Sequence, residues 1–219
     1  MDYYNHLSNA NDINMILDTI NEIFTKYYKN MFSSCHGRYH TMFVVDMVEH
    51  ILKSLSYYAR TIELGKVAAL LHDTGMITGR WEHAKKSAVL SSVIFDGSDH
   101  LKPDEKKMLI QAIEDHSSGV DISSPVGAAL IIADKADFSK RRTILPIDLL
   151  SDADKNGLEI DDVEIIISND KIIINAVTTE MFNIELFIKN YTRYNLLAKA
   201  AKFLGCTCKF QINGKEVKW

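Results

Sequence analysis

An apolar helical run that ends in two adjacent metal-binding side chains is the feature that most constrains how this chain can fold. The run Val67–Leu71 leads directly into His72 and Asp73, and Gly75 follows. Imidazole and carboxylate groups are both good ligands for divalent cations, and glycine is suited to ending a helix. Because two adjacent residues cannot enclose an ion, we expect other histidines and carboxylates to reach this point from separate helices.

Four further residues of these types lie on or beside apolar segments. They are His40, His83, His116 and Asp134. A lone histidine such as His40 or His116 is more often a hydrogen-bonded core residue than a ligand, and His83 alone fits a surface position. Burying an ionised carboxylate without a partner is costly, so Asp73 and Asp134, at the ends of apolar runs, are harder to explain as residues without a functional role. The occurrence of all six residues in this order favours a metal site.

Helical periodicity extends over the first two thirds of the chain. Apolar residues spaced by three and four predict helices over residues 13–31, 38–55, 62–72, 82–95, 103–116 and 125–137, with a short helical piece near 147–154. Proline at positions 103 and 125 is typical of the first residue of a helix. The six candidate ligands therefore fall on five different predicted helices.

Beyond Gly157 the period becomes strand-like. Strands are predicted over 163–167 and 172–177 with a turn between them, then a helix over 184–204, and a second hairpin over 207–219 that turns at Asn213–Gly214. We therefore expect a mainly α protein, with an all-helical metal-binding domain over 1–157 and a small α+β domain over 158–219. The exposed hairpin edges could pair with a second copy to form a homodimer, or could cover the site as a lid.

Composition limits the kinds of partner. The net charge of −4 over 219 residues argues against a long nucleic acid as partner. Three cysteines, Cys35, Cys206 and Cys208, form no disulfide framework and fit a reducing compartment. No signal peptide is evident, and the longest apolar runs, such as Ala128–Ala133, are too short to cross a bilayer. We therefore expect a cytoplasmic protein without a membrane partner.

The ligand set is compatible with one or two ions. His40, His72, Asp73 and Asp134 can hold a single ion and leave positions open for water and substrate. The second oxygen of Asp73 can bridge to another ion that is completed by His83 and His116. Ligands of these types suit Mn, Fe, Co, Ni or Zn, and Mg where oxygen ligands dominate.

The order His, His-Asp, His, His, Asp on consecutive helices resembles the HD-domain superfamily of metal-dependent phosphohydrolases. The resemblance covers roughly residues 38–142, about half of the chain. It implies an HD-type helical bundle, with His40, His72, Asp73 and Asp134 as core ligands and with His83 and His116 completing a binuclear variant. The chain departs from the cyclic-dinucleotide phosphodiesterase branch, because Met76 replaces a lysine and no Gly-Tyr-Pro signature follows.

The resemblance implies hydrolysis of a phosphoester or phosphoanhydride bond in a small phosphorylated substrate, with a nucleotide as the expected substrate, by a metal-activated water at Asp73. The basic residues near the ligands are candidates for binding phosphate, namely Arg38, Arg80, Lys135, Lys140, Arg141 and Arg142. For the four that follow Asp134, a solvated helix end is an equally good explanation. Asp137 either orients a ligand histidine or an arginine, or is simply solvated. The alternatives are an HD-type di-iron oxygenase and a non-catalytic nucleotide-sensing module.

Overall fold

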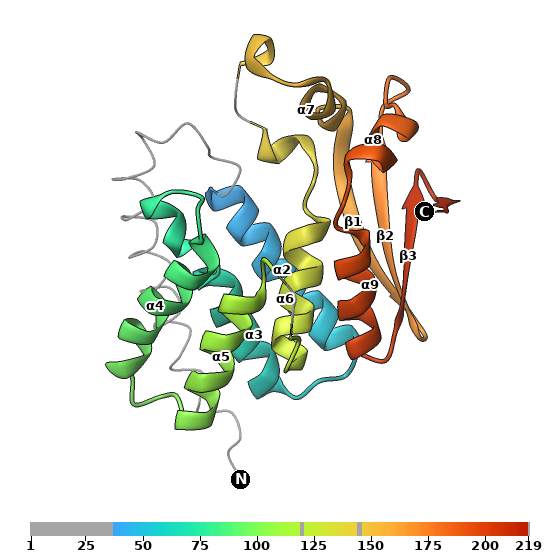
Figure 1. The fold of residues 1–219 in the computed structure, drawn as a ribbon. Helices are drawn as coiled ribbons and strands as arrows, with labels where there is room; N and C mark the ends of the chain where they lie inside the picture. The colour runs from blue at the N-terminus through green and yellow to red at the C-terminus, as the bar shows by residue number, and fades with distance from the viewer. Residues whose placement is uncertain (1–36, 119–120, 144–145, 219) are drawn as a thin grey trace.

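The chain is mainly helical and carries a small sheet near its C-terminus (Figure 1). The computed structural model describes residues 37–118, 121–143 and 146–218, so the predicted helix over 13–31 and Cys35 lie outside the described residues. None of the described helices is both long and apolar enough to cross a membrane. The mainly α fold with a C-terminal α+β part, expected from the sequence, is thereby confirmed at this level.

Each of the five helices expected between residues 38 and 137 is present. They are α2 (Arg38–Ser54), α3 (Ala59–Leu71), α4 (His83–Asp96), α5 (Pro103–Asp115) and α6 (Pro125–Ala136). Pro103 and Pro125 occupy first helical positions, where the N–H group that proline lacks would have no partner within the helix. The sequence did not predict the short 3₁₀ helix η2 (Thr74–Thr78), which follows Asp73 directly.

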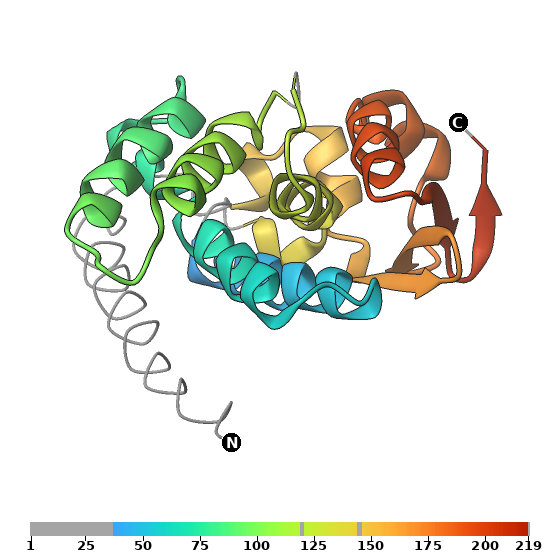
Figure 2. The ribbon, with the colours of Figure 1, turned by 90° about the horizontal axis from the view of Figure 1, so that it is seen from below.

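Helix α6 is the centre of the molecule. Every residue from Val126 to Ala136 is buried, and the helix contacts α2, α3 and α5 as well as α9 (Tyr194–Phe203). Figure 2 looks along α6 and shows α5 on one side of it and α9 on the other. A helix that is apolar on all sides must be enclosed in this way. The enclosure fixes the position of Asp134 in its last turn.

The four strands form one sheet in the order β1-β2-β3-β4. The antiparallel pair β1 (Ile160–Ser168) and β2 (Lys171–Thr178) is followed by β3 (Thr207–Ile212), which pairs parallel to β2, and by β4 (Lys215–Val217), antiparallel to β3. Asn213 and Gly214 both have positive φ, 49° and 77°, as a two-residue hairpin turn requires. Both predicted hairpins are therefore present.

The single helix predicted over 184–204 is wrong, because the chain forms two helices there, α8 (Ile184–Asn190) and α9. The break falls at Tyr191, where ψ is 89°. The Tyr191 hydroxyl donates a hydrogen bond to the Lys135 carbonyl at 2.7 Å, and its ring stacks on Phe187. These tertiary contacts replace the continuous helix that the apolar pattern suggested.

The short helical piece expected near 147–154 is also divided in two. A 3₁₀ turn, η4 (Ile147–Leu149), precedes α7 (Asp152–Gly157). Ser151 separates them and caps α7 by accepting a hydrogen bond from the Asp154 N–H. The cap explains why a new helix begins at this point.

The helical part and the sheet share one continuous hydrophobic core. Phe138, which follows α6, stacks on Phe210 of β3 with 5.5 Å between ring centroids and also packs against Phe187 and Tyr191. The change of sequence period near residue 157 therefore coincides with no gap in the core.

Replacing Phe210 with Ala should destabilise the whole described chain, since the lost ring belongs to the core shared by both parts. We expect the free energy of unfolding to fall by about 3–5 kcal/mol, in one cooperative transition followed by circular dichroism during denaturation. Ile166→Ala, on an exposed position of β1, is the matched control and should cost about 1 kcal/mol or less. Loss of the sheet signal alone, with the helical transition unchanged, would show that the parts unfold independently.

Candidate metal centre

Three helices direct their C-terminal ends at one point. Helix α3 ends immediately before His72, α5 ends immediately before His116, and Asp134 lies in the last turn of α6. The C-terminus of a helix carries a partial negative charge, which favours a cation nearby. The three helix ends thus make the electrostatic potential in this region negative, in addition to the effect of the carboxylates.

The six candidate ligands meet around the Asp73 carboxylate. Its Oδ2 lies 3.1 Å from Nε2 of His72 and 3.6 Å from Nε2 of His40. Its Oδ1 lies 3.4 Å from Nε2 of His83 and 3.6 Å from Nε2 of His116. Each oxygen of Asp73 therefore faces its own pair of imidazoles, which is the arrangement that a bridging carboxylate needs.

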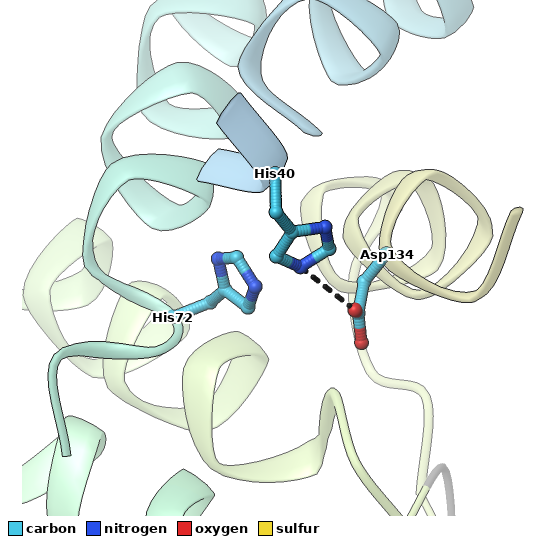
Figure 3. A group of neighbouring side chains, drawn as sticks. All are labelled: His40, His72 and Asp134. Carbon is cyan, nitrogen blue, oxygen red and sulfur yellow. Dashed lines mark ion pairs between the residues drawn. The ribbon is translucent and has the colours of Figure 1, made fainter. Parts of the chain in front are cut away.

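Asp134 closes the side of the cluster that contains His40. Its Oδ1 lies 3.3 Å from Nε2 of His40, and Figure 3 shows His40, His72 and Asp134 pointing toward one another from three different elements. Two sets have their ligand atoms within 4.8 Å of one another, namely His40, His72 and Asp134, and His72, Asp73 and His116. Two donors held at about 2.1 Å from one ion lie roughly 3.0–3.4 Å apart, so the spacing suits direct coordination.

A hydrogen bond from Nδ1 to a backbone carbonyl oxygen fixes the tautomer of three of the histidines. Nδ1 of His72, His116 and His83 lies 2.7, 2.6 and 3.1 Å from the carbonyl oxygens of Ala69, Ile113 and Arg80. A carbonyl oxygen can only accept a hydrogen bond, so Nδ1 carries the proton in each ring. The lone pair of each neutral ring is then on Nε2, the atom that points into the cluster, as in histidines that bind metals.

The Nε2 lone pairs of His83 and His116 face each other, an arrangement that a cation between them would stabilise. Nε2 of His83 and Nε2 of His116 lie 3.3 Å apart, although both rings donate through Nδ1. Nε2 of His72 is buried and forms no hydrogen bond with any described residue. Buried polar atoms are normally bonded, and nitrogens with lone pairs directed at each other repel. A proton shared by His83 and His116 would resolve only the first conflict, whereas divalent ions could accept lone pairs from all three rings, so the residues present fit a divalent metal.

The charges of the cluster perturb its titration. Burial opposes protonation of His72, but the charges of Asp73 and Asp134 outweigh it and raise the pKa of His72. Burial lowers the pKa of His116. Burial also disfavours the ionised form of Asp134, yet the Lys135 ammonium and the neighbouring histidines hold the pKa of Asp134 well below its usual range. Asp134 is therefore ionised and available as a ligand at neutral pH.

Asp137 orients a candidate ligand. Its Oδ2 accepts a hydrogen bond from Nδ1 of His40 at 2.8 Å, and its Oδ1 accepts one from the Ser139 hydroxyl at 3.2 Å. Nε of Arg141 lies 3.3 Å from the same Oδ1. A carboxylate behind a ligand histidine holds the ring and raises its basicity. The sequence left this role open beside two others, and the structure shows contacts to both the histidine and an arginine.

The basic residues differ in what they contact. Lys135 is buried and donates to Oδ2 of Asp134 at 2.5 Å, and Arg142 donates to the Asp137 carbonyl at 3.0 Å. Arg141 also donates to Asp162 of β1 and lies over the Phe43 ring, while Lys140 pairs with Asp161.

The two remaining basic candidates are Arg80 and Arg38. Arg80 is exposed in the turn before α4. Arg38 begins α2, and its side chain is not among the described ones.

Close packing between η2 and α4 explains Gly75, which the sequence suggested only as a helix terminator. A Cβ on Gly75 would lie 2.5 Å from the backbone nitrogen of Ser87 and closer still to the His83 carbonyl oxygen. The Gly75 N–H donates to the Ser87 hydroxyl at 2.8 Å. Only glycine lets the Asp73 segment approach the start of α4 this closely. No pattern in the sequence identifies Ser87 as the partner of Gly75.

Comparison with known proteins gives no further identification: no family model matches the chain, and no curated protein matches its sequence.

Replacing Gly75 with Ala should separate η2 from α4, because the methyl group overlaps backbone atoms that cannot move independently. We expect destabilisation of about 1–3 kcal/mol in chemical denaturation, and a larger loss of metal from the His83–His116 pair than from the His40 side, measured as ions bound per chain. Gly157→Ala is the control, since nothing lies within 4 Å of the added carbon. Unchanged stability and unchanged metal content in Gly75→Ala would contradict this account of the packing.

Replacing Asp137 with Asn should weaken metal binding without removing a ligand, because a neutral amide holds the His40 Nδ1–H less strongly. Calorimetric titration with Mn²⁺ or Zn²⁺ is expected to show affinity reduced about 10- to 100-fold. Asp46→Asn, on an exposed position of the same helix as His40, should leave the affinity unchanged. Equal affinities in both variants would mean that Asp137 does not act through His40.

Proposed function

We propose that this chain is a metal-dependent phosphohydrolase of the HD type, which cleaves a phosphoester or phosphoanhydride bond of a small phosphorylated substrate. The observation that carries the proposal is the position of Asp73 between two pairs of imidazoles, one pair on each carboxylate oxygen. This arrangement joins the ordered His and Asp residues of the sequence into one buried cluster.

The chain's own groups prepare the site for hydrolysis. His40, His72, Asp73 and Asp134 would hold one ion, and His83 and His116 would hold a second through the other oxygen of Asp73. Divalent ions at these positions supply a water of lowered pKa and neutralise charge that develops on the phosphoryl oxygens. Asp137 and the three carbonyls behind the other histidines keep every Nε2 directed inward.

Cations beside the ligands support a phosphoryl substrate. Lys135 lies at hydrogen-bonding distance from Asp134, and the Arg142 guanidinium lies 3.8 Å from the same carboxylate. When Asp134 shares its charge with an ion, these cations become available to a phosphate oxygen. Exposed Arg80 adds positive charge close to His83.

Loss of the bridging carboxylate should abolish both metal binding and turnover. For Asp73→Ala we expect the metal content, measured by elemental mass spectrometry, to fall from two ions to less than one per chain. Phosphate release from a panel of nucleotides, and p-nitrophenolate release from bis(p-nitrophenyl) phosphate, should fall at least about 1,000-fold, equivalent to roughly 4 kcal/mol. Circular dichroism verifies that the variant is folded, and Asp46→Ala serves as the control.

Two outcomes would contradict the proposal. The first is an Asp73→Ala protein that retains its metal and its full rate. The second is an iron-loaded wild-type protein that consumes dioxygen but hydrolyses no member of the panel, which would indicate an oxygenase.

A further inference from the structure

Solvent reaches the cluster from the side of His83. The side chains of His40, His72, Asp73, His116 and Asp134 are almost completely buried, whereas that of His83 is 15% exposed. A substrate that approaches the cluster from solvent therefore meets the segment that carries His83.

That segment is a constrained turn. The Arg80 carbonyl accepts hydrogen bonds from the His83 N–H at 3.3 Å and from its Nδ1 at 3.1 Å, so the turn and the imidazole are tied together. Glu82 adopts a left-handed conformation, with φ at 53°, which is unfavourable for a residue with a side chain. Such conformations persist only where the surroundings enforce them, and they are enriched at functional sites. The backbone at Trp81 is thus held in place beside His83.

Trp81 is 80% exposed at this position. Tryptophan combines a large apolar face with little conformational freedom, so an exposed one is suited to covering a planar ring. Single exposed aromatics occur on many surfaces. What distinguishes Trp81 is its place, two residues from the one candidate ligand that solvent reaches.

Arg80 supplies the matching charge. Within the described part of the chain Arg80 forms no ion pair, whereas Lys135, Arg141 and Arg142 each lie against a carboxylate. The nearest acid in the turn, Glu82, is paired with Lys85 at 3.0 Å. The Arg80 guanidinium is therefore a cation close to His83 whose charge no acid in the described part of the chain offsets.

From these observations, and resting on the proposed function, we propose that the turn Arg80–Glu82 recognises a nucleoside phosphate whose base stacks on Trp81 and whose phosphate contacts Arg80. Two residues span at most about 7 Å, so the groups that bind base and phosphate lie within reach of one nucleotide. Stacking on an aromatic side chain tolerates every base, because each base has a π-face. The substrate class is then nucleotides as a group, in preference to sugar phosphates without a base.

Tryptophan fluorescence tests the proposal without requiring turnover. The chain has two tryptophans, so Trp219→Phe leaves Trp81 as the single reporter. We expect saturable quenching by adenosine 5′-monophosphate and by adenosine 5′-triphosphate, and none by ribose 5-phosphate or inorganic phosphate. In calorimetry, Trp81→Ala should raise the Kd of both nucleotides about 5- to 150-fold and leave that of ribose 5-phosphate unchanged, while Trp81→Phe should retain most of the affinity.

The matched control is Tyr58→Ala. Tyr58 is equally exposed but precedes α3 at the end opposite His72, about 20 Å away at 1.5 Å per helical residue, so its loss should not alter nucleotide affinity.

The possible failures of the two proposals are distinct. Trp81 fluorescence that no nucleotide changes, in a protein that binds metal and hydrolyses phosphoesters, would overturn the recognition role and leave the proposed function intact. A fluorescence shift with phosphatidylserine vesicles but not with nucleotides would overturn it in favour of a membrane surface. Quenching by nucleotides in a protein that never hydrolyses them would support recognition by Trp81 and contradict the hydrolase.

Discussion

Burial of the Asp73 carboxylate is the constraint on which the rest of the structure depends. Asp73 lies with Asp134 and Asp137 where three helices present the negative ends of their dipoles, and all three carboxylates are buried. Buried charge of one sign is costly unless cations and hydrogen bonds compensate it. Lys135 compensates Asp134, and Arg141 and Ser139 contact Asp137. Asp73 has four imidazoles around it, and a protonated histidine or a metal ion at that place would compensate its charge.

The core that holds this charge in place extends beyond the helices that supply the ligands. The Tyr191 hydroxyl bonds the Lys135 carbonyl at the end of α6, and Phe138 carries the aromatic packing from that end into β3. Arg141 reaches both Asp137 beside the cluster and Asp162 on β1. The sheet therefore supports the end of α6 that bears Asp134, although it supplies none of the six candidate ligands.

The sequence revealed the parts of this architecture that local patterns encode. Helix periods, Pro103 and Pro125 at helix starts, and the Asn213–Gly214 turn predicted the five helices between residues 38 and 137 and both hairpins. The placing of six ligand-type residues on apolar segments predicted that they would meet. Contacts between distant segments could not be predicted from the sequence. The break at Tyr191 follows from a bond to Lys135, 56 residues away, and the tight fit of Gly75 against α4 depends on Ser87. The parallel pairing of β2 with β3 likewise depends on where α8 and α9 pack, which no period in the sequence specifies.

The charge around the cluster also changes the meaning of the basic run that follows Asp134. In the sequence, Lys135, Lys140, Arg141 and Arg142 form a positive patch, but in the structure Lys135 and Arg142 lie beside Asp134, Arg141 pairs with Asp137 and Asp162, and Lys140 pairs with Asp161. Each of these cations thus lies beside a carboxylate, so the basic run presents less net positive charge than its sequence suggests. Divalent ions bound at the candidate ligands would add positive charge there and would offset part of the Asp134 charge that Lys135 and Arg142 face. Under the proposed function, metal and phosphate binding would be coupled through Asp134, because an ion bound to it would leave more of the charge of Lys135 and Arg142 for a phosphate.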